Sequence, residues 1–219
     1  MNEKPVKLYL ISGVTGVVGG ILMIVSACIV IFQLQGAYAG ETKAKMEFIA
    51  EMPLVGITHG LSFVSLLLIT PAVVASFVLF RSVATTRASL GITFAMFWLV
   101  IEMIGHLWHT APLRALTELY NAEATQNTAL AIYVVSDEFW EALSNAAAFI
   151  AVLTFICYGL IFLAAKNLLL SVLILLACIA FPVGMMWPSI GIQPHTILRG
   201  LSLIIISGVL IRAVVTEED

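Results

Sequence analysis

Six long apolar stretches, separated by more polar segments, organise the chain. They cover residues 8–32, 57–80, 88–109, 142–165, 168–187 and 195–215. An α-helix needs about 20 apolar residues to cross the hydrocarbon core of a bilayer, and each stretch reaches about that length. The pattern predicts an all-α fold: a polytopic transmembrane helical bundle with six membrane-spanning helices, forming one integral membrane domain over residues 1–219.

The composition supports the same class. Hydrophobic residues make up 61% of the chain and charged residues 11%, whereas a soluble domain usually carries about 25% charged residues. So few charges cannot cover a water-facing surface. No basic patch or nucleic-acid motif is present, so we expect no nucleic-acid partner. The lipid bilayer is the expected surrounding, and a homo-oligomer or partner membrane subunits stay open.

Lysine and arginine residues near the ends of the stretches indicate the orientation. One side collects Lys4, Lys7, Arg81, Arg87, Lys166 and Arg212, and the other has Lys43, Lys45, Arg114 and Arg199. Cytoplasmic loops carry an excess of Lys and Arg. The bias therefore predicts a multi-pass protein of the cell membrane with both termini in the cytoplasm. The first stretch exceeds the roughly 7–15 apolar residues of a signal peptide, so we expect it to remain as a helix.

Two long connections, 33–56 and 110–136, carry helix signals of their own. Residues 41–52 place Glu41 with Lys45, and Lys43 with Glu47, at helical spacing, which predicts a short interfacial helix. Pro112 and the apolar residues after it predict a second one. The apolar stretch 129–135 either extends the fourth helix outward or lies on the membrane.

The first stretch carries Gly13, Gly16, Gly19 and Gly20, and Gly16 and Gly20 have the GxxxG spacing. Small residues let transmembrane helices approach closely. Internal packing and dimerisation both produce this pattern, and a chain of six helices favours internal packing.

The ionisable residues inside the apolar stretches are the candidate chemistry. Glu102, His106 and His109 fall within about 60° of one helical face. Such groups are costly in a membrane unless they are paired, hydrated or metal-bound, so they are functional candidates. On the predicted topology they meet other polar groups at the outer end. The predicted pocket contains His59, Glu102, His106, His109, Glu138, Glu141, His195 and Arg199, with Asn145 as a further ligand-binding candidate.

Arg199 and Glu102 are predicted to form an ion pair between the third and sixth helices. At about 1.5 Å per residue, Arg199 lies about 6 Å and Glu102 about 10 Å below the outer end, and an arginine side chain can close that difference. The pair is either a structural clamp or a part of the pocket, since membrane charges tend to pair whatever their role.

The four histidines, His59, His106, His109 and His195, are the candidate metal ligands. Zinc takes three or four nitrogen, sulfur or oxygen ligands. Iron uses two histidines and a carboxylate, copper favours imidazole and thioether groups, and two histidines on different helices can hold a single haem b. Histidine and tryptophan are also common at a membrane interface. Trp108, Trp140 and Trp187 predict such an aromatic belt, and a proton- or ligand-binding pocket without metal is an equal alternative.

Three functional classes stay open: a metal- or haem-dependent membrane enzyme, a transporter, and a structural or sensory subunit. A transporter needs a polar path that continues inward, and the inner halves of the stretches are almost wholly apolar. This counts against transport.

The chain resembles the small bacterial six-helix membrane proteins grouped as domain of unknown function 4386. The resemblance lies in the glycine-bearing first helix, residues 13–22, and in residues 78–83, Val-Leu-Phe-Arg-Ser-Val, at the end of the second helix. It implies a six-helix fold over most of the chain. That family has no assigned reaction, so the resemblance implies no catalytic residues.

Overall fold

The computed structural model describes residues 4–33, 42–52, 54–186 and 193–218. These residues are almost entirely helical and contain no strand, which confirms the all-α prediction. The elements are α1 (Lys4–Gln33), α3 (Thr42–Glu51), α4 (Leu54–Phe80), α5 (Thr85–Asn121), the 3-10 turn η1 (Glu123–Thr125), α6 (Gln126–Ala164), α7 (Leu168–Met186) and α8 (Gln193–Glu218).

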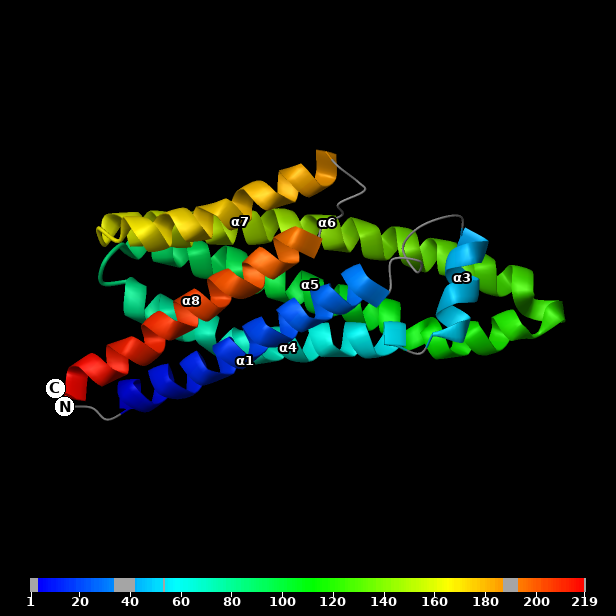
Figure 1. Ribbon diagram of the computed structural model, residues 1–219, viewed down its shortest axis with the longest axis horizontal. Coiled ribbons are helices and arrows are strands. Elements are labelled where there is room, and N and C mark those ends of the chain that lie inside the picture. Colours follow the sequence, from blue (N-terminus) through cyan, green and yellow to red (C-terminus); the bar gives the residue numbers. More distant parts are fainter. Residues whose placement is uncertain (1–3, 34–41, 53, 187–192, 219) are drawn as a thin grey trace.

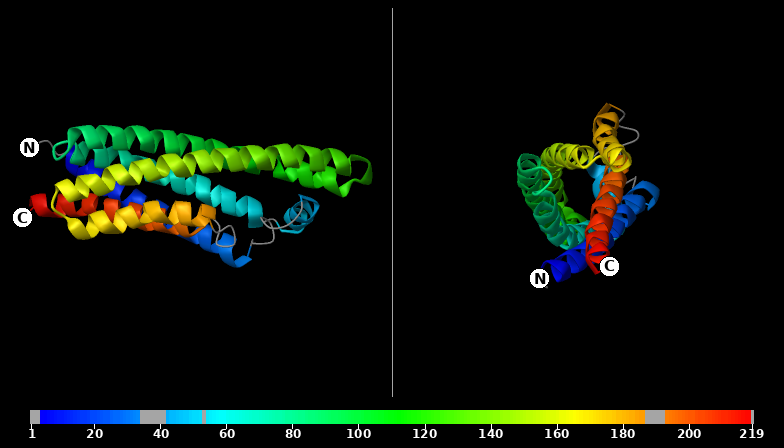
Figure 2. Two further views of the ribbon diagram at one scale, coloured as in Figure 1. Left: turned by 90° about the horizontal axis from the view of Figure 1, so that it is seen from above. Right: turned by 90° about the vertical axis from the view of Figure 1, so that its left-hand side faces the viewer.

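Six helices, α1 and α4 to α8, run along one axis and form the bundle (Figures 1 and 2). Within it α1 packs between α4 and α8, α5 packs on α4 and α6, and α7 lies against α6 and α8. Both ends of the chain lie at the same end of the bundle (Figure 1), which we call the proximal end. The opposite end, where α3 lies, is the distal end.

The described residues include five helices that are long and apolar enough to cross a membrane. These are Lys7–Gln33, Leu54–Phe80, Thr85–Trp108, Glu123–Ala164 and His195–Val215. The apolar part of α7, Leu168–Val183, is shorter. The prediction of a membrane-spanning helical bundle therefore agrees with the structure, while the fifth of the six predicted spans, at 168–187, is not confirmed by length.

Helices α5 and α6 are longer than the sequence pattern predicts. The third helix was expected to end at residue 109 and to be followed by a long connection, but α5 continues to Asn121 and α6 starts at Gln126. Of the two alternatives for residues 129–135, the outward extension of the fourth helix is therefore the observed one. The two helices form a hairpin that projects beyond the distal end of the bundle (Figures 1 and 2).

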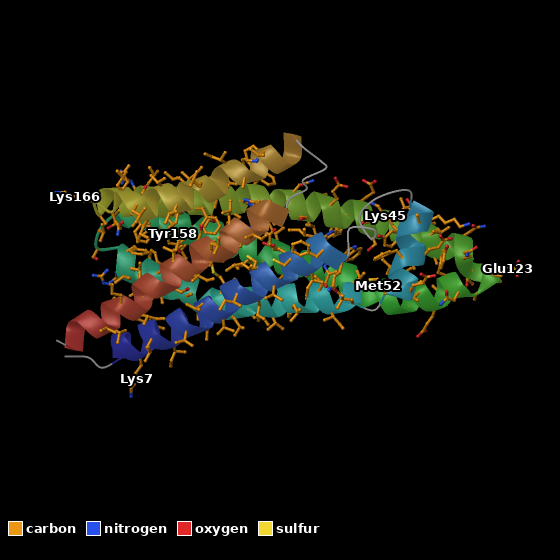
Figure 3. All side chains as sticks on the ribbon, viewed as in Figure 1. Lys7, Lys45, Met52, Glu123, Tyr158 and Lys166 are labelled. Atoms are coloured by element: carbon orange, nitrogen blue, oxygen red, sulfur yellow. The ribbon has the colours of Figure 1, made fainter. Side chains whose placement is uncertain are left out.

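The short helix predicted within residues 41–52 is confirmed as α3, which covers one face of the projecting hairpin near Lys45 and Met52 (Figure 3). The contact between α3 and the hairpin explains why the hairpin is helical beyond the main bundle. The same contact forms a second core, separate from the main one, whose buried members are Met46, Ile49, Val55, Leu116, Tyr120, Ala129 and Tyr133. Such burial overrides the weak local preferences of a polar segment.

Polar contacts also hold α3 in place. Lys45 donates to Asp137 of α6 at 3.1 Å, and the Tyr120 hydroxyl of α5 donates to Glu47 at 3.2 Å. Burial and the neighbouring Glu47 carboxylate raise the pKa of Tyr120, so the phenol stays protonated. Lys43 and Glu47 form the predicted i,i+4 pair at 3.9 Å, whereas Glu41 lies outside the described residues.

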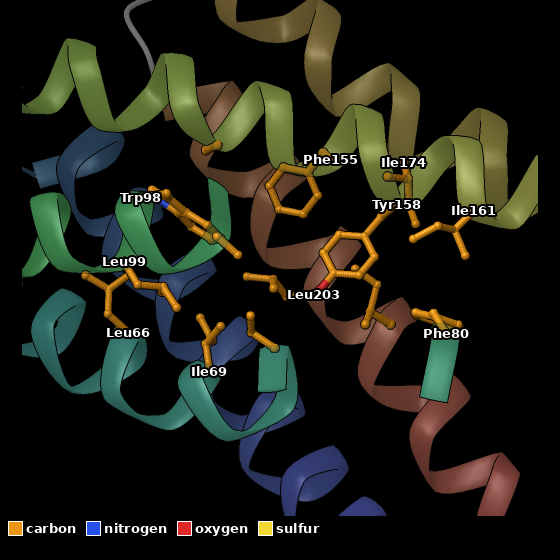
Figure 4. Close-up of a cluster of buried hydrophobic side chains, with 14 of the residues drawn as sticks. Leu66, Ile69, Phe80, Trp98, Leu99, Phe155, Tyr158, Ile161, Ile174 and Leu203 are labelled. Atoms are coloured by element: carbon orange, nitrogen blue, oxygen red, sulfur yellow. The ribbon is translucent and has the colours of Figure 1, made fainter. Parts of the chain in front are cut away.

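The main core fills the centre of the bundle. Trp98 of α5 and Phe155 of α6 pack with ring centroids 5.7 Å apart, and Leu66 of α4 and Leu203 of α8 belong to the same cluster (Figure 4). Burial against these large side chains fixes the rotation of each helix, because dispersion and shape matching drive helix packing in lipid.

Close backbone contacts at glycines hold α1 against its neighbours. A Cβ at Gly20 would lie 2.8 Å from the Gly200 carbonyl oxygen of α8, and a Cβ at Gly200 would lie 2.8 Å from the Gly20 carbonyl oxygen. On the α4 side, the Ser65 hydroxyl donates to the Gly19 carbonyl at 2.8 Å. The GxxxG spacing of Gly16 and Gly20 therefore serves internal packing, as predicted.

We expect Gly200→Ala to destabilise the bundle by about 1–3 kcal/mol, because the added methyl group has no room at the α1–α8 crossing. Gly208→Ala on the same helix is the matched control, since a Cβ there meets nothing within 4 Å. Thermal unfolding of both variants in one detergent measures the difference. Equal stability of the two variants would contradict the packing described.

Candidate functional site

The site centres on the predicted ion pair between Glu102 of α5 and Arg199 of α8, which the structure confirms. Nη1 of Arg199 lies 2.8 Å from Oε2 of Glu102, and Nη2 lies 3.0 Å from Oε1. Arg199 is 4% exposed and Glu102 9% exposed. Two parallel charge-assisted hydrogen bonds are the strongest arrangement these groups can adopt.

Neighbouring side chains complete this pair. The Trp98 indole N–H, one turn before Glu102 on α5, donates to the same carboxylate. The Arg199 guanidinium carbon lies 5.4 Å from the centroid of the Trp98 ring, within the range of a cation–π contact, and Nη2 donates to the Thr196 hydroxyl at 3.3 Å. The pair is thus neutral as a unit and satisfied at both carboxylate oxygens. Among the described residues, Nε of Arg199 has no hydrogen-bond partner.

One turn closer to the distal end than Glu102, His106 of α5 contacts His59 of α4. Their Nδ1 atoms lie 3.1 Å apart, and both side chains are buried. A neutral imidazole has one N–H donor and one bare acceptor nitrogen. This contact therefore requires a hydrogen on Nδ1 of one ring and none on Nδ1 of the other, so the two histidines are opposite tautomers that share one proton.

Trp140 of α6 packs against both imidazoles. Its ring centroid lies 4.9 Å from that of His106 and 5.3 Å from that of His59. Gly105 makes this approach possible, because a Cβ there would lie 2.7 Å from the Trp140 ring. The sequence analysis assigned Trp140 to an aromatic belt at the membrane interface. The structure shows that its ring contacts both imidazoles of the histidine pair.

His195 does not join this pair. It lies one turn from Arg199 on α8, and its Nδ1 donates to the Ala177 carbonyl of α7 at 3.0 Å, beside the Phe181 ring. Because a carbonyl only accepts, Nε2 of His195 is the bare nitrogen. That atom is buried and has no hydrogen-bond partner within the described part of the chain.

The other candidate ligands are placed differently. Glu138 and Glu141 are exposed on α6, and Asn145 is half-buried. The side chain of His109 lies outside the described residues. Across the described side chains, no group of three or more His, Cys, Asp or Glu residues is arranged to hold a metal. The structure therefore joins Glu102 to Arg199 and His59 to His106, while the metal and ligand roles assigned to the whole set stay predictions.

Two partners in the site were missed by sequence reasoning. Trp98 carries a usable signal, because it lies four residues before Glu102 and so shares its helical face. No residue of α6 near Trp140 signals that it belongs to the site. Its role depends on Gly105 of α5, and that pairing is visible only once the two helices are side by side.

No protein-family model, no curated protein and no solved structure matches this chain.

We expect Glu102→Gln and Arg199→Met each to destabilise the protein by about 3–5 kcal/mol, because each leaves one charge buried without its partner. The double variant Glu102→Gln with Arg199→Met should be less destabilised than either, since it removes both charges and keeps most of the volume. Unfolding of the variants in the same detergent compares them. A double variant that loses the sum of the two single effects would show that the groups act independently.

Proposed function

We propose that this protein is a six-span integral membrane protein of the cell membrane that binds and responds to a proton at the His59–His106 pair, as a sensory subunit. In addition to the five spans described above, α7 is the remaining one. Its 19 residues extend about 28 Å at 1.5 Å per residue. Six crossings agree with both termini lying at the proximal end. The Lys and Arg bias supports a cytoplasmic proximal end, so that the histidine pair faces outward.

The observation that carries the proposal is the contact between two Nδ1 atoms at 3.1 Å. With one shared proton the contact is a hydrogen bond. A further proton on the bare Nδ1 would turn both Nδ1 atoms into donors that face each other, so the rings must separate. The pair is therefore an element with two arrangements, selected by proton binding, and histidine is the side chain that titrates near neutral pH.

The surroundings of the pair suit this role. Trp140 of α6 contacts both rings and must follow any change in their positions. Glu102 of α5 lies one turn from His106 and binds Arg199 of α8, while Asp137, Glu138 and Glu141 lie near Trp140 on α6. The charge of Glu102 is already balanced by Arg199. A cation that binds to the histidine pair is therefore not neutralised by Glu102, and its binding changes the local charge.

A transition-metal ion is the second candidate, and the same spacing favours it. Two nitrogens bound to a tetrahedral zinc at about 2.0–2.1 Å lie about 3.3 Å apart, close to the 3.1 Å observed. Further ligands would have to come from His109 or from solvent. The proton reading needs no further ligand, so it is the better supported of the two.

We also propose that the chain is related to the proteins grouped as domain of unknown function 4386. The glycine-bearing α1 and the end of α4 at Phe80 support this relationship. The close packing of α1 at Gly19 and Gly20 is a physical reason for small residues at these positions.

We expect acidification from about pH 8 to about pH 5 to change the fluorescence of Trp140, because a proton bound at the pair moves the rings that Trp140 contacts. The Trp140 signal is the difference between the protein and its Trp140→Phe variant. His106→Gln should abolish the change, whereas His195→Gln, a buried histidine bound to Ala177, should preserve it. A response that survives His106→Gln would remove the histidine pair as its origin.

Metal analysis of the detergent-purified protein separates the two candidates. A proton site predicts no stoichiometric zinc, iron or copper and no haem absorption, together with a scalar coupling between the two Nδ1 atoms in ¹⁵N NMR of labelled histidine. Stoichiometric metal that disappears in His106→Ala would overturn the proton reading in favour of the metal one.

A further inference from the structure

We propose that α3 regulates the histidine pair: when it is docked on the distal end it favours the hydrogen-bonded arrangement of the rings, so α3 docking and proton binding oppose each other. This inference rests on the proposed function, because it assigns a regulator to that same pair. Helix α3 packs on α4, α5 and α6 near the distal end (Figure 1). These are the three helices that carry His59, His106 and Trp140.

On α6, the face covered by α3 continues into the face that carries Trp140. Tyr133, Asp137 and Trp140 follow one another at spacings of four and three residues, which places them on one helical face. Tyr133 is buried in the second core beneath α3, and Asp137 accepts a hydrogen bond from Lys45 of α3 at 3.1 Å. The Trp140 ring contacts both imidazoles. A displacement of Trp140 therefore reaches the α3 contact through a single turn of α6.

The other two helices show the same order. On α4, Val55 of the second core is 1% exposed, and His59 follows four residues later on the same face. On α5, Tyr120 lies 14 residues after His106, close to four full turns, so these two also share a face. The Tyr120 hydroxyl donates to Glu47 of α3. Each helix of the site thus meets α3 along the face that carries its site residue.

The shared faces link α3 docking to proton binding. A further proton on the bare Nδ1 separates the two rings, and Trp140 must follow them. These displacements act on α4, α5 and α6, which together with α3 supply the buried members of the second core. A close-packed core tolerates such shifts poorly, so proton binding weakens the docking of α3. Linkage is reciprocal: docked α3 lowers the proton affinity of the pair by the same factor.

The charges around the pair supply a reporter of docking. Helix α4 has no charged residue from Leu54 to Phe80, and α1 has none from Leu8 to Gln33. Asp137 both binds α3 and lies one turn from Trp140, so its bond to Lys45 reports whether α3 is docked. The described charged or titratable groups near the pair on α3, α5, α6 and α8 are Lys43, Lys45, Glu47, Glu102, Tyr120, Asp137, Glu138, Glu141 and Arg199.

The first experiment reads docking with a zero-length cross-linker on the full-length protein in detergent. A carbodiimide joins the Lys45 amine to the Asp137 carboxylate as an amide while the two groups are in contact, and mass spectrometry quantifies the product. The amide between Lys43 and Glu47, both within α3, is the internal reference. We expect the ratio of the two cross-links to fall at least about fivefold between about pH 7.5 and about pH 5, and to stay constant in His106→Gln.

The second experiment weakens docking without changing any charge. Met46→Ala and Ile49→Ala remove buried side chains of α3 from the second core, and the cross-link ratio at neutral pH measures how far each loosens α3. Both should raise the pH midpoint of the Trp140 fluorescence by about 0.7 unit or more, the shift that a fivefold coupling gives. Val134→Ala, which shortens an exposed apolar residue of the same hairpin, is the matched control and should leave the midpoint unchanged.

The outcomes separate this inference from the proton site itself. A wild-type protein whose Trp140 responds to acid through His106, while the cross-link ratio stays constant, would keep the proton site and remove the link to α3. A ratio that falls equally in His106→Gln would assign the loss of docking to other groups and overturn the inference. Unchanged midpoints in variants with a lowered cross-link ratio would overturn it as well. A wild type without any response that depends on His106 would remove the proton site and its regulation together.

Discussion

Two opposite charges inside a bilayer persist only when they bind each other, and this requirement sets the arrangement of the whole bundle. Glu102 and Arg199 are far apart in the chain, on α5 and α8, yet their two parallel hydrogen bonds demand that these helices hold one relative height and rotation. The contact is specific, because two parallel hydrogen bonds between a guanidinium and a carboxylate form only in a narrow range of geometry. The ion pair therefore fixes the register on which the other contacts depend.

The rest of the site follows from that register. With Glu102 facing α8, the same face of α5 presents His106 one turn outward, where His59 of α4 meets it. Gly105 then leaves room for Trp140 of α6. On the other side, α8 is held against α1 by the Gly20–Gly200 crossing. The contacts around this buried pair thus connect five helices, through polar and aromatic groups on one side and glycine contacts on the other.

Sequence reasoning succeeded where one helix carries the whole signal. Apolar length predicts the spanning helices, and the depths of Glu102 and Arg199 predict their pairing because each charge has few alternatives. It failed where the outcome depends on a neighbouring helix. The continuation of α5 and α6 relies on burial beneath α3, and His195 turned to the Ala177 carbonyl because α7 lies beside it. The order of helices around the bundle decides both, and no local pattern encodes that order.

The unbroken course of α5 has a mechanical consequence. One helix of 37 residues extends about 55 Å at 1.5 Å per residue, and it carries both the tip of the projecting hairpin and the buried residues Glu102 and His106. A rod without a joint cannot bend locally to absorb a push at its tip. Tilting or turning the hairpin at the distal end therefore moves the Glu102 carboxylate and the His106 imidazole together.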